Sequence, residues 1–297
     1  MTDGAVLVIG NFDGVHRGHV ELLRAARKAE PDARLVAVTF WPHPMSVIRP
    51  DQAPPLLTSL DRRLELLHTA GVDEVVVVDF TTEVAEWSPA EFYDQVLRTL
   101  RPVRIVVGEN FRFGFRAAGD VAALSELAGP DTIVQPVPLV SDGTVPSSST
   151  LIRHAVVDGD LGRVRELSDQ VFRLSGEVVR GDQRGRQMGY PTANVAVSHE
   201  LAVPADGVYA GWVTRLDIPS PRWPAAISVG TNPTFDGVER RVEAYVLDRD
   251  DLELYGVEIA IDFYLRMRGQ VKYEGMEALI EQMHLDVDQI RTLLREV

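Results

Sequence analysis

Four short apolar runs alternate with helix-like segments in the first half of the chain, and this alternation constrains the fold more than any other feature. The runs are AVLVIG, RLVAVTF, EVVVVDF and RIVVGENF. Strands buried on both faces of a parallel sheet have this continuous, β-branched composition. Between the runs lie HVELLRAARKAE, SLDRRLELLHTAG and SPAEFYDQVLRTLR, with apolar residues at helical spacing. The pattern predicts an α/β domain with a doubly wound parallel sheet over residues 1–170.

The pattern changes after about residue 170. Strand-like runs now follow one another, broken by Gly, Pro, Asn and Asp: FRLSGEVVRG, ADGVYAGWVTRL, AAISVGTNPTF, RRVEAYVLD and GVEIAIDFYLRMRG. Such runs predict a small antiparallel β-barrel as a second domain, residues 171–297. The C-terminal MEALIEQMHLDVDQIRTLLREV predicts an amphipathic helix pair or one broken helix, and residues 149–169 predict helix, turn, helix.

Composition narrows the classes of function. The chain of 297 residues has no cysteine, which excludes disulfides and thiolate metal sites. A net charge of −14 argues against general nucleic-acid binding. No apolar stretch at the start is long enough for a signal peptide or membrane helix, so a cytoplasmic protein without a membrane partner is expected. The oligomeric state stays open.

The basic residues restrict how a phosphate is bound. The only lysines are Lys28 and Lys272, and neither lies in a G-x-x-x-x-G-K-[ST] loop. A phosphate site in this chain must therefore use arginine, histidine, backbone N–H groups or a metal ion.

The stretch GNFDGVHRGH, residues 10–19, follows the first predicted strand. Ligands of open α/β sheets bind beyond the carboxyl ends of the strands, and Gly10 and Gly18 allow a ligand to approach the backbone. A helix starting near Gly18 supplies free N–H groups, and His16 and His19 share one face of its first turn. Imidazoles placed there suit the charge on a phosphate being transferred. The alternative is a surface loop with glycines for turn geometry.

A run of hydroxyls marks the start of another helix. Ser148, Ser149 and Thr150 offer hydroxyls and N-terminal amides, and Arg153 lies one turn further, within reach of a phosphate. An ordinary N-cap explains the serines equally well.

A third group of residues lies in the predicted barrel. Gly181, Gly185 and Gly189 keep the backbone open for an anion-binding loop. Thr192 and Asn194 present two oxygen donors on one side of an extended segment, and such donors suit Mg²⁺. Glu243 is a lone carboxylate on an apolar strand, where it shares a face with Tyr245. A plain strand and turn, with Glu243 facing solvent, remains the alternative.

The first half resembles a known family. H-x-G-H is typical of the nucleotidyltransferase superfamily, and TFWPHPMSV, VVGENFRFG and SSSTLIR follow it in order. Together they resemble the FMN adenylyltransferase module of bacterial bifunctional riboflavin kinase/FAD synthetases. The resemblance implies two sets of binding residues. Those for the ATP phosphates are Asn11, His16, His19, Ser149, Thr150 and Arg153, and those bordering the flavin are His43, Asn110, Phe111 and Phe113. The two phenylalanines are equally compatible with the core.

The second half resembles the riboflavin kinase module of the same enzymes. The similar stretches are MGYPTANV, ADGVYAG, SVGTNPTF, VEAYVLD followed by LYG, and RMRGQVKYEGMEALIEQM, in order. The resemblance implies that Thr192 and Asn194 bind Mg-ATP, that Glu243 is the general base, and that Arg268 lies near the flavin. Departures from the family pattern stand at Trp41, Pro146, Ala244 and Tyr245.

The two resemblances together predict a bifunctional enzyme. It would phosphorylate riboflavin to FMN with ATP and Mg²⁺, and adenylylate FMN to FAD with release of pyrophosphate. Two alternatives remain: a riboflavin kinase with a degenerate N-terminal module, and a non-catalytic flavin-binding regulatory protein. The intact histidines and Glu243 argue against the second, because a protein that only binds needs no general base.

Overall fold

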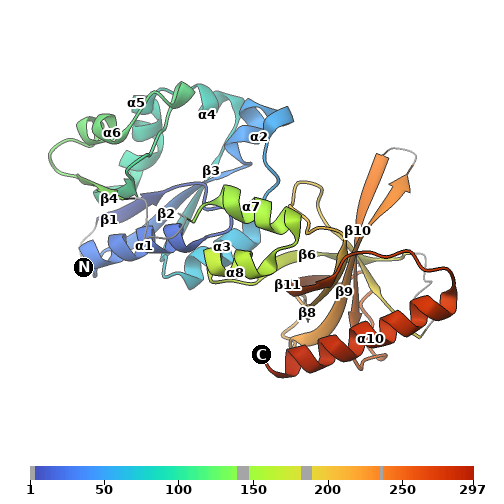
Figure 1. Cartoon of the computed structure of the whole chain (residues 1–297). Coiled ribbons are helices and arrows are strands. Elements are labelled where there is room, and N and C mark those ends of the chain that lie inside the picture. Colours follow the sequence, from blue (N-terminus) through green and yellow to red (C-terminus); the bar gives the residue numbers. More distant parts are fainter. Residues whose placement is uncertain (1–3, 139–146, 182–188, 235–236) are drawn as a thin grey trace. The chain divides into compact units, whose positions relative to one another are not determined.

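The structure is a computed structural model that describes residues 4–138, 147–181, 189–234 and 237–297. The chain divides into two units, Met1–Ser149 and Thr150–Val297. Figure 1 shows an α/β unit and a barrel unit. Residues 150–170, which the sequence pattern assigns to the first domain, belong to the second unit.

A five-stranded parallel sheet forms the centre of the first unit (Figure 1). Its order is β3-β2-β1-β4-β5, so the first strand lies in the middle. The strands are β1 (Ala5–Ile9), β2 (Arg34–Trp41), β3 (Glu74–Asp79), β4 (Pro102–Gly108) and β5 (Ile133–Val137). The sequence predicts the first four. It does not predict β5, because Gln135 and Pro136 interrupt its apolar run, as an edge strand tolerates.

Helices cover both faces of this sheet, which confirms the doubly wound arrangement. Val6 and Val8 of β1 pack with α1 and α3, whereas Leu7 and Ile9 pack with α5 and α6. Because successive side chains of a strand point to opposite faces, a continuous apolar run serves both layers. The helical elements are α1 (Arg17–Ala29), α2 (Pro44–Ile48), η1 (Pro50–Gln52), α3 (Leu60–Thr69), α4 (Thr82–Glu86), α5 (Pro89–Phe92), η2 (Tyr93–Leu97), η3 (Arg98–Leu100), η4 (Phe115–Ala117) and α6 (Val121–Ala128).

The second unit contains a closed antiparallel barrel with the order β10-β7-β6-β11-β8-β9. Its strands are β6 (Phe172–Val179), β7 (Ala193–Ala196), β8 (Gly207–Arg215), β9 (Trp223–Thr234), β10 (Gly237–Val246) and β11 (Glu258–Arg268). Before it come α7 (Ser149–Asp158) and α8 (Leu161–Ser168), as predicted. The helix α8 packs against β11, where the Arg165 guanidinium lies 4.3 Å from the Tyr264 ring centroid.

The C-terminal helix corrects one expectation. The sequence pattern predicts a helix pair or a broken helix, but α10 (Met276–Arg295) is a single helix of 20 residues. Its sequence contains no Gly or Pro, so nothing in the chain interrupts its hydrogen bonds. Val287, Ile290 and Leu294 on one side of the helix pack with Trp212 and Leu247 of the barrel.

Candidate active sites

The loop that follows β1 has an unusual backbone. Phe12 has φ +49° and Val15 has φ +35°, with Gly14 at φ +82° between them. Left-handed conformations are costly for residues with a Cβ and most costly for β-branched ones, and they persist only where the surroundings enforce them. Phe12 and Val15 are both fully buried, so packing holds this strained loop in place.

The loop delivers two stacked imidazoles to the start of α1. His16 is the N-cap residue, and its ring lies 3.7 Å from that of His19, with 21° between the ring planes. The Phe12 ring contacts His19 edge-on, at a centroid distance of 5.0 Å. The His16 side chain makes no capping hydrogen bond to this first turn. The predicted sharing of one face by the two histidines is confirmed.

Gly18 is the glycine of the H-x-G-H stretch, and its size matters for the pair. A Cβ added at Gly18 would lie 3.2 Å from both Cε1 and Nδ1 of His16. That is closer than ordinary carbon contacts, so a larger residue would displace the imidazole. The glycine therefore lets the His16 ring fold over the helix start, whereas a Cβ at Gly10 would make only ordinary contacts of 3.4 Å or more with Phe12.

The charge state of His19 follows from its surroundings. Burial, then His16 and Arg63, hold the pKa of His19 well below its usual range. Its Nδ1 is buried and has no hydrogen-bond partner among the described residues. His19 is therefore neutral at physiological pH, and one ring nitrogen carries a proton that it can donate.

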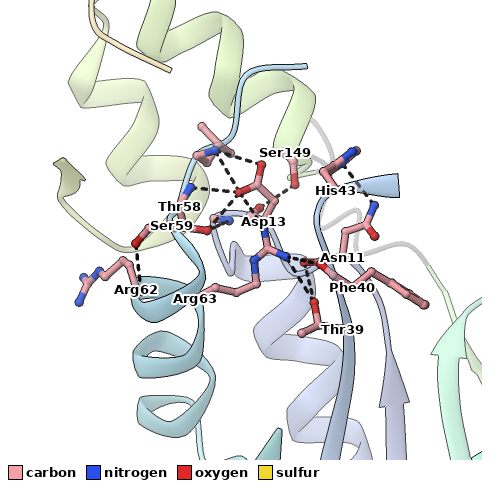
Figure 2. A network of polar contacts seen from close by, with 12 residues as sticks. Asn11, Asp13, Thr39, Phe40, His43, Thr58, Ser59, Arg62, Arg63 and Ser149 are labelled. Carbon is pink, nitrogen blue, oxygen red and sulfur yellow. Dashed lines mark hydrogen bonds and ion pairs between the residues drawn. The ribbon is translucent and has the colours of Figure 1, made fainter. Parts of the chain in front are cut away.

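A buried polar network holds the loop from below (Figure 2). The Asp13 carboxylate is 1% exposed and accepts hydrogen bonds from the backbone N–H groups of Leu57 and Thr58, at 3.0 and 3.1 Å. The Thr58 hydroxyl donates to the same carboxylate at 3.1 Å. Arg63 of α3 is completely buried, and its Nη2 lies 3.7 Å from Asp13 Oδ1. The sequence pattern does not predict this network.

His43 and Asn11 lie next to each other, although they come from different predicted sets. His43 Nε2 is 3.5 Å from Asn11 Nδ2, and His43 Nδ1 accepts a hydrogen bond from the Met45 N–H at 3.1 Å. His43 thereby caps α2 and is only 8% exposed. The structure thus joins the end of β2 to the loop after β1, side by side at the carboxyl edge of the sheet (Figure 2).

The loop after β4 carries the other predicted flavin residues. Phe111 and Phe113 stack at a centroid distance of 5.4 Å with 15° between the rings. Phe113 is 7% exposed and belongs to the core, whereas Phe111 is half-buried and Asn110 is exposed. Phe113 is therefore a core residue, as the alternative states. Its ring stacks on the half-buried ring of Phe111.

The predicted hydroxyl run lies at the start of α7. The Ser149 hydroxyl donates to the Asp13 carbonyl at 2.8 Å, so it is tied to the loop after β1 (Figure 2). Ser148 comes directly before the helix and is half-buried. Thr150 is exposed and Arg153 is half-buried; both belong to α7 in the second unit.

Three predicted residues of the barrel come together. Glu243 of β10 pairs in register with Asn194 of β7, and the Thr192 hydroxyl donates to Glu243 Oε2 at 3.0 Å. Val242 and Ala244 point into the core at 1% exposure, so Glu243 faces the other way, as the strand alternation predicts.

Gly181 lies directly against this group. A Cβ added there would approach the carboxamide atoms of Asn194 to 2.5 Å, a distance that real Cβ atoms do not reach. Gly181 therefore leaves room for the Asn194 side chain. Gly185, which was predicted with it, lies outside the described residues.

A cavity of about 820 Å³ opens beside Thr192 and Asn194. Gly181 and Gly189 border it, and residues 249–255 between β10 and β11 form its far wall. This segment was not predicted as part of a site. Its residues combine carboxylates with apolar side chains, and of these residues only Leu254 and Tyr255 belong to a stretch that resembles the kinase module, LYG.

Arg268 has a defined partner in the structure. Its Nη2 and Nε donate to the Asp286 carboxylate of α10 at 2.6 and 3.0 Å, and Asp286 is 5% exposed. Gln282 donates to the same carboxylate at 2.9 Å. The guanidinium of Arg268 thus fastens the C-terminal helix to the end of β11.

Comparisons with known proteins assign a family to each half of the chain. The family model described as FAD synthetase matches residues 1–151, and the one described as riboflavin kinase matches residues 168–294. A curated bifunctional riboflavin kinase/FMN adenylyltransferase from Escherichia coli strain K12 is 34% identical, over 96% of this chain and 91% of the relative. The relative of the same description from Listeria monocytogenes is 33% identical, over 98% and 93%. The chain belongs to the bifunctional riboflavin kinase/FMN adenylyltransferase family.

A solved structure has the same fold over the whole length. It is described as a macrolide-efflux protein from Streptococcus pneumoniae, is 32% identical, and covers 98% of this chain and 95% of its own, with a TM-score of 0.87. In the parts of this chain that the structure describes, no helix is both long and apolar enough to cross a membrane.

Two residues of the first site, Asp13 and Arg63, are not predicted from the sequence and are identified by the structure. A signal for Asp13 exists, since it lies in GNFDG, the stretch that directly follows the first strand. Arg63 gave none, because it occupies an ordinary position in a helix that carries several charged residues.

Proposed function

We propose that this chain catalyses two successive reactions of flavin cofactor synthesis. The barrel unit phosphorylates riboflavin to FMN with ATP, and the α/β unit adenylylates FMN to FAD and releases pyrophosphate. The observation that carries this proposal is that each of the two family-matched ranges contains its own converging polar group. One group is the imidazole pair at α1, and the other is Glu243 with Thr192 and Asn194.

The adenylylation site uses the carboxyl edge of the parallel sheet. His16 and His19 stabilise the charge that develops on the transferred phosphate, and Gly10 and Gly18 let that phosphate approach the backbone. A neutral His19 donates one hydrogen bond without adding a charge to the buried site. The further ATP-binding residues of this proposal are Asn11, Ser148, Ser149, Thr150 and Arg153.

The flavin end of this site lies beside β2 and β4. His43 touches Asn11, so a flavin bordered by His43 would lie next to the phosphates. Phe111 presents a half-buried ring for the isoalloxazine, Phe113 supports that ring, and exposed Asn110 borders it. An aromatic face of this kind suits a planar heterocycle.

The kinase site is organised around Glu243. The Thr192 hydroxyl donates to Oε2 and orients the carboxylate, and we assign Oε1 to accept the proton of the ribityl 5′-hydroxyl. A primary alcohol is a weak nucleophile at neutral pH, so it requires a base of this kind. The cavity beside Thr192 takes the ATP, with Gly181 on its border. Arg268 lies near the flavin and holds α10 in place.

The donor set fits a magnesium ion. The Thr192 hydroxyl proton points to Glu243, so the oxygen lone pairs remain for a cation, and Asn194 offers its carboxamide oxygen. Mg²⁺ prefers such hard oxygen donors and keeps water or phosphate oxygens in its remaining positions. Among the described residues no cluster of three or more His, Asp or Glu side chains suits a metal ion. When bound, Mg²⁺ neutralises charge on the ATP phosphates.

One assay tests both activities. The protein is incubated with riboflavin, ATP and Mg²⁺, and riboflavin, FMN and FAD are separated by chromatography. The wild-type chain should form FMN and then FAD. Accumulation of FMN without FAD would support the kinase-only alternative, and no conversion would support the flavin-binding alternative.

Two variants locate the reactions. His16→Ala with His19→Ala should abolish FAD formation and spare FMN formation, because each lost donor costs about 10²–10³ in rate. Glu243→Gln should slow FMN formation by about 10²–10⁴ and leave adenylylation of supplied FMN near normal. Each variant is the control for the other, and a variant that slows both reactions equally would count against the assignment.

A further inference from the structure

Asp13 and Arg63 form a buried pair of opposite charges next to the imidazoles. Arg63 is completely buried and Asp13 is 1% exposed, so neither side chain can reach a substrate. Burying two charges is unfavourable unless each is paired and hydrogen-bonded. The chain retains this pair at the carboxyl edge of the sheet, and the contacts of each partner indicate its role.

Asp13 ties the loop after β1 to the segment before α3. Its Oδ1 accepts from the Thr58 N–H and the Thr58 hydroxyl, and both its oxygens lie 3.0 Å from the Leu57 N–H. The Asp13 carbonyl accepts from Ser149 at 2.8 Å. One residue therefore connects the loop to the segment before α3 and to the predicted hydroxyl run at the start of α7.

Arg63 ties the same network to the end of β2. Its Nη1 donates to the Phe40 carbonyl at 3.1 Å and lies 3.5 Å from the Thr39 hydroxyl. That hydroxyl donates to the Asn11 carbonyl at 3.0 Å, which returns to the loop after β1. Figure 2 shows the resulting closed circuit, from Asn11 through Thr39 and Arg63 to Asp13.

The circuit encloses the strained residue Phe12, which contacts His19. Phe12 stands between Asn11 and Asp13 with φ +49°, and its ring packs edge-on against His19 at 5.0 Å. If the loop relaxed, this ring would move and the His19 contact would change. We propose, on the basis of the adenylylation assigned above, that Asp13 and Arg63 are positioning residues that fix the loop and thereby the imidazole pair.

The pair also influences His19 through charge. His16 on the same helix and Arg63 on α3 are the charged or titratable groups that, together with burial, lower the pKa of His19. Asp13 neutralises part of the Arg63 charge from the loop side, at 3.7 Å. Removing the guanidinium would take away a positive charge that lowers the pKa of His19 and would leave the negative charge of Asp13 unpaired. Each of these two effects raises the pKa of His19.

The test compares two variants. Arg63→Met removes the positive charge, whereas Arg63→Lys keeps the charge but loses the two guanidinium nitrogens that reach Phe40 and Asp13 at once. Arg62→Met is the matched control, because Arg62 is the neighbouring residue on α3 and pairs only with Glu65 among the ion pairs described. FAD formation from FMN gives kcat and KM, FMN formation by the other unit reports intact protein, and histidine NMR follows the titration of His19, assigned with His19→Gln.

Arg63→Met should lower kcat for FAD formation by about 10²-fold, as expected for catalytic groups displaced by about 1 Å. His19 should then titrate at higher pH than in the wild type. Arg63→Lys should lower kcat by about tenfold with the His19 titration unchanged. Arg62→Met should change neither quantity.

Three results would overturn the inference: Arg63→Met with kcat within twofold of the wild type, Arg63→Met with an unmoved His19 titration, or Arg63→Lys with wild-type kcat. The last result decides the question if the methionine variant does not fold. A wild-type chain that makes no FAD refutes the proposed function instead, and the titration of His19 still tests whether Arg63 acts on it.

Discussion

Gly18→Ala separates catalytic geometry from stability in a single substitution. Alanine normally improves a helix at the expense of glycine, by up to about 1 kcal/mol in a helix interior. Gly18 is the second residue of α1 and has no positive φ that would penalise alanine. Its new Cβ would, however, lie 3.2 Å from two atoms of the His16 ring, so that ring must shift by a few tenths of an ångström.

The size of the effect follows from that shift. A misplacement of about 1 Å costs about 10²-fold in rate, so a shift of about 0.3–0.5 Å should slow adenylylation by about four- to tenfold. This equals about 0.8–1.4 kcal/mol of transition-state stabilisation. Phosphorylation of riboflavin uses the other unit and should stay at the wild-type rate, and the free energy of unfolding should be unchanged or higher.

Gly162→Ala provides the control. Gly162 is also the second residue of its helix, α8, but a Cβ there would make only an ordinary 3.4 Å contact with Asp160 Oδ1. The assay measures FAD formation from FMN, FMN formation from riboflavin, and urea unfolding for both variants. Wild-type FAD formation by Gly18→Ala, or an equal loss in Gly162→Ala, would refute the reasoning.

Three further predictions concern other parts of the chain. His19→Gln should flatten the loss of stability between pH 7.5 and 5.5 in urea unfolding: because the folded pKa of His19 is lowered, its neutral form stabilises the fold fully above about pH 6.5 and this contribution falls at lower pH. A wild-type slope in the variant would contradict this. Gly181→Ala should slow FMN formation but not FAD formation, because its Cβ would lie 2.5 Å from the Asn194 carboxamide and would displace it. A variant that forms FMN at the wild-type rate would refute this. A fragment of residues 150–297 should resist urea better than one of residues 171–297, since α8 packs against β11, and equal midpoints would show that α8 adds nothing.

The sequence alone carries much of the fold. Continuous apolar runs alternating with helical spacing predict the parallel sheet and its two helical layers, because these patterns depend only on local periodicity. The same holds for the barrel strands and for the alternation that turns Glu243 away from the core. Local signals fail where the apolar pattern is weak, as at β5 with its Pro136. They also leave open whether a long helical pattern forms one helix or two, as at α10, which is a single helix.

The motifs also identify which residues gather at each site, although not how they interact. The spacing of His16 and His19 predicts a shared face, and the structure adds a ring stack at 3.7 Å and a buried, neutral His19. Thr192 and Glu243 are 51 residues apart, and only the register of β10 on β7 brings them to a hydrogen bond.

Only the tertiary structure determines the buried contacts, such as Arg63 with Asp13, that hold the motif residues in position. Arg63 is 50 residues from Asp13 and sits in a helix whose other charged side chains are at least partly exposed, so its burial depends on how α3 meets the ends of β1 and β2. The cost of a buried charge, and the cost of a left-handed Phe12, depend on contacts between segments that are distant along the chain. A sequence records the residues that make such contacts, and the contacts themselves exist only when the segments are folded together.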